Sequence, residues 1–203
     1  MKAAYTKPFL TAAFIILLDQ IIKIWVKTHM IPGEAGEIHL LGNRGMLHYI
    51  ENNGMAFGME LGGDFGKLAL TIFRIVAVVG IGFALVHLIK HKYHRGLIMM
   101  VALILAGAVG NIIDSTFYGV IYHYAGWFHG RVVDMFYFPL ITGHFPNWFP
   151  IWKGEEFIFF RPVFNLADAA ISIGVIMILI NQKRYFKHET PETSYPNSEM
   201  VEE

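Results

Sequence analysis

Four long apolar stretches divide this chain, and charged residues are rare inside them. They cover approximately residues 9–26, 68–89, 96–113 and 163–180. A helix rises about 1.5 Å per residue, so about 20 apolar residues cross the roughly 30 Å hydrocarbon core of a bilayer. The pattern predicts an all-α membrane protein, built as a four-transmembrane-helix bundle in a single domain over residues 1–188.

The segments between the predicted helices have patterns of their own. Residues 46–51 are typical of a short strand and Asn53-Gly54 is a turn signal, so we expect a small β cradle on the membrane surface. Residues 135–162 are rich in Phe, Tyr and Trp, which favour the headgroup region and predict an aromatic insert there. Residues 189–203 are acidic and rich in Pro, Ser and Thr, which predicts a disordered tail.

Lysine and arginine set the expected orientation in the membrane. The two longer connections, about residues 28–67 and 114–162, carry few cations for their length. Basic residues concentrate before the first stretch, between the second and third, and after the fourth: Lys2 and Lys7; Lys90, Lys92 and Arg95; Lys183, Arg184 and Lys187. By the positive-inside rule, both termini, the tail and the short link are cytoplasmic, and the β cradle and the aromatic insert are extracytoplasmic.

Composition supports a membrane protein and excludes several kinds of site. Hydrophobic residues make up 55% of the 203 residues and charged residues only 16%, against about a quarter in a soluble domain. The formal net charge is zero, so charge gives no argument for binding nucleic acid. The absence of cysteine excludes a disulfide framework, a thiol nucleophile and a thiolate metal site.

Two carboxylates lie within or between long apolar stretches, where an ionised group is energetically unfavourable. Asp168 lies near the start of the fourth apolar stretch, and Asp134 lies between the third stretch and the fourth. A carboxylate at a hydrocarbon boundary is costly unless it is paired, hydrogen-bonded or protonated. Two carboxylates that converge can share one proton and hold a water molecule, which is the chemical basis of aspartic proteolysis.

An Asn-x-x-Asp pattern occurs twice, at Asn111 and Asp114 and again at Asn165 and Asp168. Residues three apart share one helix face, so each amide can orient groups beside its carboxylate. The alternative is that these polar side chains only hold helices together. Small residues that let another helix approach closely precede the first pair: Gly107, Ala108 and Gly110.

Charged residues also occur inside the first two stretches. Asp19 and Lys23 are four residues apart, the favourable spacing for an ion pair on one helix face, and we expect a structural or substrate-orienting role for them. Arg74 lies near the start of the second stretch.

Five short motifs together resemble the bacterial lipoprotein signal peptidases (signal peptidase II), a family of intramembrane aspartic proteases. They occur in the family's order and cover most of the chain between residues 14 and 180. The motifs are LDQIIK (18–23), NNGMAFG (52–58), GAVGNIID (107–114), GRVVD (130–134) and FNLAD (164–168).

The resemblance implies an activity, a location and partners. The family removes the signal peptide from prolipoproteins just before a cysteine that carries diacylglycerol, in the bacterial cytoplasmic (inner) membrane and near its periplasmic face. The partners implied are the diacylglyceryl prolipoprotein substrate, membrane lipid and an inhibitor of the globomycin type. No metal or other cofactor is implied.

The resemblance also assigns residues. The catalytic pair falls on Asp134 and Asp168, although Asp114 is an alternative that is better embedded in its motif. Supporting or substrate-binding positions fall on Asn52, Asp19, Lys23, Asn111, Asp114, Asn165 and Arg131.

The chain departs from the family pattern in two places. The family usually has arginine directly after the aspartate of the third motif, but here the residue is Ser115. Arg131 and Arg161 are candidates to replace that arginine. Residues 135–162 also form a longer segment than in most members, which suggests an extra lid or a partner surface.

Two other functions compete with the peptidase. A small proton-coupled carrier would also keep carboxylates in its membrane spans, but we expect them near the midplane. A non-enzymatic assembly factor acting through the aromatic insert would need no paired carboxylates.

Overall fold

The computed structural model describes residues 2–53, 63–139, 141–144, 146, 148, 154, 156–159 and 162–186. The predicted disordered tail at 189–203 lies outside the described residues, as do Arg161 and much of the second motif.

Three helices are long and apolar enough to cross a membrane, and they contain the first three predicted apolar stretches. They are α1 (Lys2–His29), α2 (Gly63–Lys90) and α3 (Arg95–Ile113). The last of these continues through a π-helical turn, η3 (Asp114–Tyr118), into α4 (Gly119–Ile121).

A fourth apolar helix, α5 (Leu166–Ile180), has only 15 residues. It begins later than the predicted stretch because Val163–Phe164 form a strand, and Asn165 then caps the helix. A short helix, α6 (Gln182–Tyr185), follows it.

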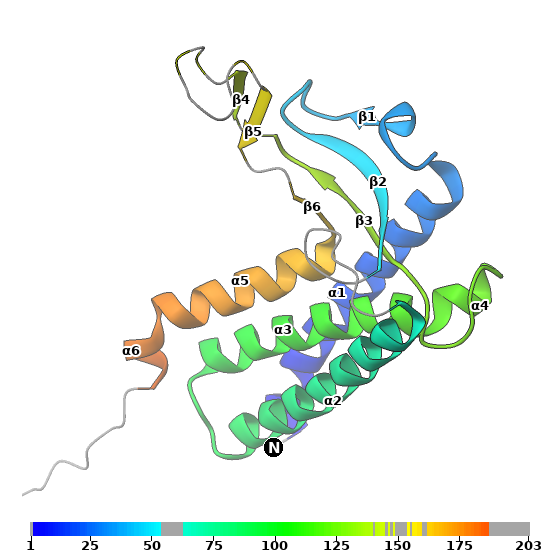
Figure 1. Ribbon diagram of the computed structural model, residues 1–203. Coiled ribbons are helices and arrows are strands. Elements are labelled where there is room, and N and C mark those ends of the chain that lie inside the picture. Colours follow the sequence, from blue (N-terminus) through cyan, green and yellow to red (C-terminus); the bar gives the residue numbers. More distant parts are fainter. Residues whose placement is uncertain are drawn as a thin grey trace, which may run out of the picture.

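The third helix is the centre of the helical layer. In Figure 1, α3 lies between α5 and α2, with α1 behind, and α3 contacts all three helices. Against α2 the contact is an apolar cluster that includes Leu85 and Ile89 with Ile98, Ala102 and Leu105.

Close packing against α5 depends on a glycine in α3. A Cβ added at Gly107 would lie 2.2 Å from the carbonyl oxygen of Ala167, far inside a normal contact distance. Glycine therefore lets α5 approach the backbone of α3, which confirms the predicted use of small residues on this face.

A four-stranded antiparallel sheet stands at one end of the helices (Figure 1). Its strand order is β1-β2-β3-β6, and its register places Ile50 opposite Asp134. The strands are β1 (Ile38–His39), β2 (Met46–Asn52), β3 (Val132–Tyr137) and β6 (Val163–Phe164), and a one-turn 3-10 helix at Glu34–Gly36 precedes them.

The sheet confirms the predicted strand at 46–51 and corrects the all-α fold class. The structure is mostly helical, but the cradle is a sheet that joins segments far apart in the chain. The predicted aromatic insert contains a separate hairpin, β4 (Ile141–His144) with β5 (Glu156–Phe159).

Candidate active site

Both predicted catalytic aspartates lie where the sheet meets the helices. Asp134 is in the middle of β3, and Asp168 is in the first turn of α5. Asn165 fixes the start of α5 through a capping box: its Oδ1 accepts a hydrogen bond from the Asp168 backbone N at 2.9 Å, and Asp168 Oδ2 accepts one from the Asn165 backbone N at 3.3 Å. This local motif therefore sets the position of Asp168 as well as the start of the helix.

Two amide side chains connect the two carboxylates. Asn165 Nδ2 donates to Asp134 Oδ1 at 2.7 Å and to Asn111 Oδ1 at 3.1 Å. Asn111 Nδ2 in turn donates to Asp168 Oδ1 at 2.8 Å. The structure thus brings both Asn-x-x-Asp pairs of the sequence into one hydrogen-bonded chain, and this chain joins Asp134 to Asp168.

The environment of Asp134 favours a proton on its carboxyl group. Its side chain is buried, with 4% of its surface exposed. Burial raises the pKa of Asp134 to about 7, and the negative charge of Asp168 acts in the same direction. Hydrogen bonds from Asn52 and Asn165 partly oppose this rise because they favour the ionised form. Asp134 can therefore gain and lose a proton near neutral pH.

Asn52 brings β2 into the site. Its Nδ2 donates to Asp134 Oδ2 at 3.2 Å, on the side of the carboxyl group that does not face Asn165. The pairing of β2 with β3 positions Asn52 for this contact.

A buried lysine organises the helices behind the two aspartates. Lys23 Nζ lies 3.0 Å from Asp19 Oδ2 and 2.8 Å from Asp114 Oδ2, and it donates to Asn111 Oδ1 at 2.9 Å. All three charged side chains are almost completely buried. The predicted Asp19–Lys23 ion pair is confirmed, and it belongs to a larger network that also fixes Asn111.

Asp114 acts as a brace within this network. Besides Lys23, it accepts hydrogen bonds from Gln20 Nε2 at 2.9 Å and from the backbone N of Val133 at 3.3 Å. Val133 directly precedes Asp134 in β3, so Asp114 holds the strand that carries the candidate catalytic residue. These contacts favour a supporting role for Asp114.

Arg131 lies at the outer edge of the site. Its guanidinium is 3.3 Å from Glu51 Oε2, it lies over the ring of Tyr124, and half of its side chain is exposed. Glu51 also forms an ion pair with Lys27 and accepts a hydrogen bond from the Tyr49 hydroxyl at 2.6 Å.

This edge cluster fixes the end of β2. Burial acts to raise the pKa of Glu51, but hydrogen bonds from Lys27, Tyr49 and Arg131 outweigh it and hold the pKa below its ordinary value. Glu51 is therefore ionised and ties β2 to the end of α1, next to Asn52.

The motifs assign no role to Arg74, yet its side chain reaches the site. Its Nη1 donates to Ser115 Oγ at 3.4 Å, and its charge interacts with the carboxylates of Asp168, Asp134 and Asp114. Its position inside an apolar stretch is the sequence feature that could have predicted this placement, because an arginine in a membrane span usually faces a polar interior. Arg74 comes from α2, whereas the predicted replacements were Arg131 and Arg161.

Comparison with known sequences identifies a family. A model of the Signal peptidase (SPase) II family matches residues 11–184. The lipoprotein signal peptidase of Porphyromonas gingivalis is 50% identical over 194 residues, which cover 83% of this chain and 80% of that protein. The lipoprotein signal peptidase of Amoebophilus asiaticus is 39% identical over 201 residues, which cover 94% and 85% respectively.

Solved structures share the fold. A bacterial membrane enzyme determined by the in meso method at 2.3 Å matches with a TM-score of 0.62 and 24% identity, over 98% of this chain and 96% of that one. A second such enzyme, at 1.9 Å, matches with a TM-score of 0.59 and 26% identity, over 88% and 93% respectively.

The family match spans nearly all of the helical part and includes every residue of the hydrogen-bonded chain from Asp134 to Asp168. The protein is accordingly a multi-pass membrane aspartic peptidase of bacterial type that removes signal peptides from prolipoproteins. The chain belongs to the signal peptidase II family.

Proposed function

We propose that Asp134 and Asp168 are the catalytic pair, and that they activate a water molecule to cleave a prolipoprotein just before its diacylglyceryl cysteine. The observation that carries this proposal is the chain of hydrogen bonds from Asp134 through Asn165 and Asn111 to Asp168. It links two carboxylates at the boundary between the helices and the sheet.

The pair works as a unit with one shared proton near neutral pH. The ionised member takes a proton from the water molecule as its oxygen attacks the scissile carbonyl carbon. The protonated member donates to the developing oxyanion, and a proton then passes to the leaving amine as the C–N bond breaks. Asn111, Asn165 and Asn52 keep the two carboxyl groups in position throughout these steps.

The proposed setting is the bacterial cytoplasmic membrane, with a bundle of four crossings. The fourth crossing is α5, whose 15 residues extend about 22 Å, and α6 adds another turn beyond it. Lys90, Lys92 and Arg95 lie at the opposite end of the helices from the sheet, which supports cytoplasmic termini and an active site near the periplasmic face.

The decisive experiment incubates purified protein with a diacylglyceryl-modified prolipoprotein and with its unlipidated form. We expect release of the signal peptide from the lipidated substrate alone, and inhibition by globomycin. Asp134→Asn and Asp168→Asn should each lower kcat by at least about 1,000-fold, because each removes a group that moves a proton in the reaction.

Two further aspartates provide comparisons, one as a control and one as a supporting residue. Asp64 is exposed at the start of α2, so Asp64→Asn should retain full activity. Asp114→Asn should lower stability or activity by a smaller amount than the two catalytic substitutions. Full activity of either purified catalytic variant would refute the assignment of the pair.

A further inference from the structure

A cavity of about 890 Å³ opens between α1, α2 and α3, at the end of the helices remote from the sheet. This volume is within the range of ligand-binding pockets, roughly 300–1,000 Å³. The cavity shares no lining residue with the candidate active site. The cavity is therefore distinct from the site that Asp134 and Asp168 form.

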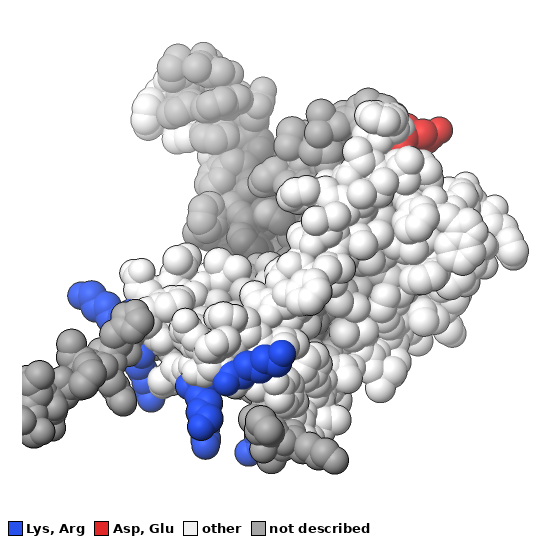
Figure 2. All heavy atoms as spheres, turned by 90° about the horizontal axis from the view of Figure 1, so that it is seen from below, with Lys and Arg blue, Asp and Glu red and all other residues white. Residues whose placement is uncertain are grey.

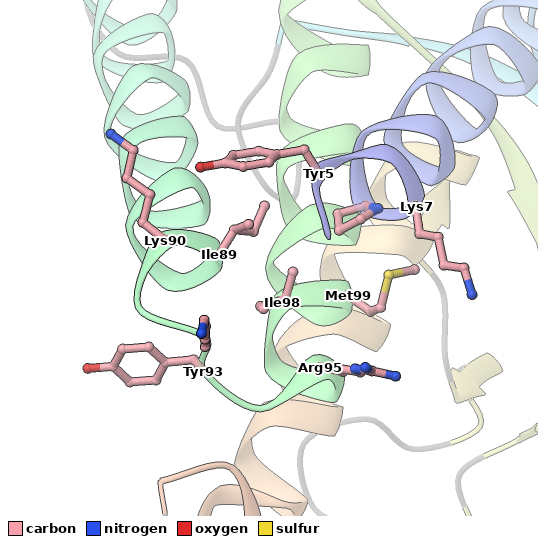
Figure 3. Close-up of a pocket in the computed structure, with 10 residues that line it drawn as sticks. Tyr5, Lys7, Ile89, Lys90, Tyr93, Arg95, Ile98 and Met99 are labelled. Atoms are coloured by element: carbon pink, nitrogen blue, oxygen red, sulfur yellow. The ribbon is translucent and has the colours of Figure 1, made fainter. Parts of the chain in front are cut away.

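The walls of the cavity are apolar. Ile89 of α2 and Ile98 and Met99 of α3 contribute aliphatic surface, and Pro8 contributes from α1. In Figure 3 the ring of Tyr5 extends from α1 across the space towards α2. These residues belong to helices that are long and apolar enough to span a membrane, so the cavity lies where hydrocarbon chains are available.

The rim of the cavity is basic. Lys7, Lys90, Lys92 and Arg95 all line it, and all four side chains are exposed. None of them forms an ion pair with an acidic residue of the described part of the chain. Figure 2 shows that lysine and arginine side chains gather at this end of the molecule.

We propose that this cavity binds one anionic phospholipid, with its phosphate at the basic rim and the start of its acyl chains against Ile89, Ile98 and Met99. An apolar wall beneath a cluster of cations is complementary to an amphipathic anion. A small soluble anion could bind the cations, but it has no apolar part that could contact the wall. Four cations also favour a lipid with net negative charge over a zwitterionic one.

The acidic tail is the competing occupant within this chain. Residues 189–203 contain five glutamates, which could approach the basic rim. The tail is otherwise rich in Pro, Ser and Thr and has few apolar residues to cover the wall. The wall therefore favours the lipid over the tail.

The test measures lipid binding to the purified full chain by native mass spectrometry, in detergent with equal amounts of phosphatidylglycerol and phosphatidylethanolamine. We expect the wild-type protein to retain one phosphatidylglycerol in preference to phosphatidylethanolamine. Lys90→Gln/Arg95→Gln should weaken phosphatidylglycerol binding by about 20- to 30-fold, since each basic residue near a membrane surface attracts anionic lipid. Met99→Trp, which places a bulkier and more rigid side chain on the apolar wall, should also weaken retention.

The matched control removes the same charge from the same end of the molecule. Lys183 and Arg184 lie on α6 and do not line the cavity, so Lys183→Gln/Arg184→Gln should leave binding unchanged. Cleavage of the lipidated substrate by each variant reports that the variant has folded.

Three outcomes would overturn the proposal. One is equal retention of both phospholipids by the wild-type protein, and another is an equal loss of binding in the two double variants. The third is much stronger phosphatidylglycerol binding by a chain truncated at residue 188, because this would identify the tail as the occupant. We expect the truncated chain to bind phosphatidylglycerol as the full chain does.

Discussion

Arg74 of α2 donates a hydrogen bond to Ser115 at the start of the π-helical turn, with 3.4 Å between Nη1 and Oγ. Ser115 stands where the family usually has an arginine, directly after Asp114. The structure places a guanidinium beside this position from a different helix. Because the charge of Arg74 also interacts with Asp134 and Asp168, we expect it to perform the electrostatic role of the missing arginine.

Replacing Arg74 should therefore lower activity, and an arginine at position 115 should restore it. Arg74→Gln removes a charge-assisted interaction worth about 1.5–3 kcal/mol, which corresponds to a fall of about 10- to 100-fold in kcat/KM. The double variant Arg74→Gln/Ser115→Arg should recover most of that loss, since it returns a cation to the same place. A kinetic assay with the lipidated substrate measures both effects.

The rescue separates a role in positioning from a role in folding. If Arg74 only packed α2 against α3, a second substitution at Ser115 would add to the damage. Wild-type activity in Arg74→Gln, or failure of Ser115→Arg to restore any activity in a variant that remains folded, would contradict the proposed compensation.

The buried carboxyl group of Asp134 should make the folded protein less stable as the pH rises. Its pKa is raised to about 7 in the folded protein, against about 4 in an unfolded chain. Between these values the folded protein binds more protons than the unfolded chain, so the free energy of unfolding decreases with increasing pH and levels off above about pH 7. Thermal unfolding in detergent between pH 4.5 and about pH 8 would measure this change.

The variant Asp134→Asn supplies the control for this pH effect. Asparagine resembles the protonated carboxyl group and cannot ionise, so the decrease in Tm with pH should be smaller in the variant. Above pH 7 the inactive variant avoids the cost of an ionised buried carboxyl group, but it loses one hydrogen bond because its Nδ2 cannot accept from Asn52 or Asn165. An identical pH dependence in both proteins would show that other groups cause it.

Lys23 should be among the most sensitive positions for stability. It is completely buried between Asp19 and Asp114, so Lys23→Met leaves two buried carboxylates without their cation. Breaking a buried ion pair in this way costs about 3–5 kcal/mol. Chemical denaturation in detergent should show a loss of this size.

Lys27 offers a comparison on the same helix. Its partner, Glu51, is partly exposed and also contacts Arg131, so Lys27→Met should cost much less than Lys23→Met. Replacing the whole buried group in Asp19→Asn/Lys23→Met/Asp114→Asn should recover part of the stability lost in Lys23→Met alone. Equal effects of the two lysine substitutions would contradict the importance of burial.

The sequence was most informative where a feature depends on neighbours in the chain. Apolar length predicts the three long helices, and a spacing of four residues predicts the ion pair of Asp19 with Lys23. The Asn165 and Asp168 pair was likewise visible as a motif, although its capping role emerges only where strand β6 ends and α5 begins.

Features that join distant segments could not be predicted in this way. The strand β3 pairs with β2 and β6, which lie far from it in the chain, and its six residues are too few to distinguish a strand from a helix end. The placement of Arg74 depends on how α2 rotates against α3, a property set by side-chain packing along the whole interface.

Gly107 should be essential because it sets the distance between α3 and the helix that carries Asp168. A Cβ at this position would meet the Ala167 carbonyl oxygen at 2.2 Å and Ile171 Cγ1 at 2.8 Å, so Gly107→Ala must push α5 away. Because Asp168 follows Ala167 directly, this movement should separate it from Asn111 and lower kcat by about 100-fold or more.

Gly80→Ala is the matched control, because a Cβ at Gly80 in α2 meets nothing within 4 Å. The Gly80→Ala variant should keep full activity, and its free energy of unfolding should rise by up to about 1 kcal/mol because alanine has a higher helix propensity than glycine. Equal activity of the two alanine variants would show that close contact between α3 and α5 is not required for catalysis.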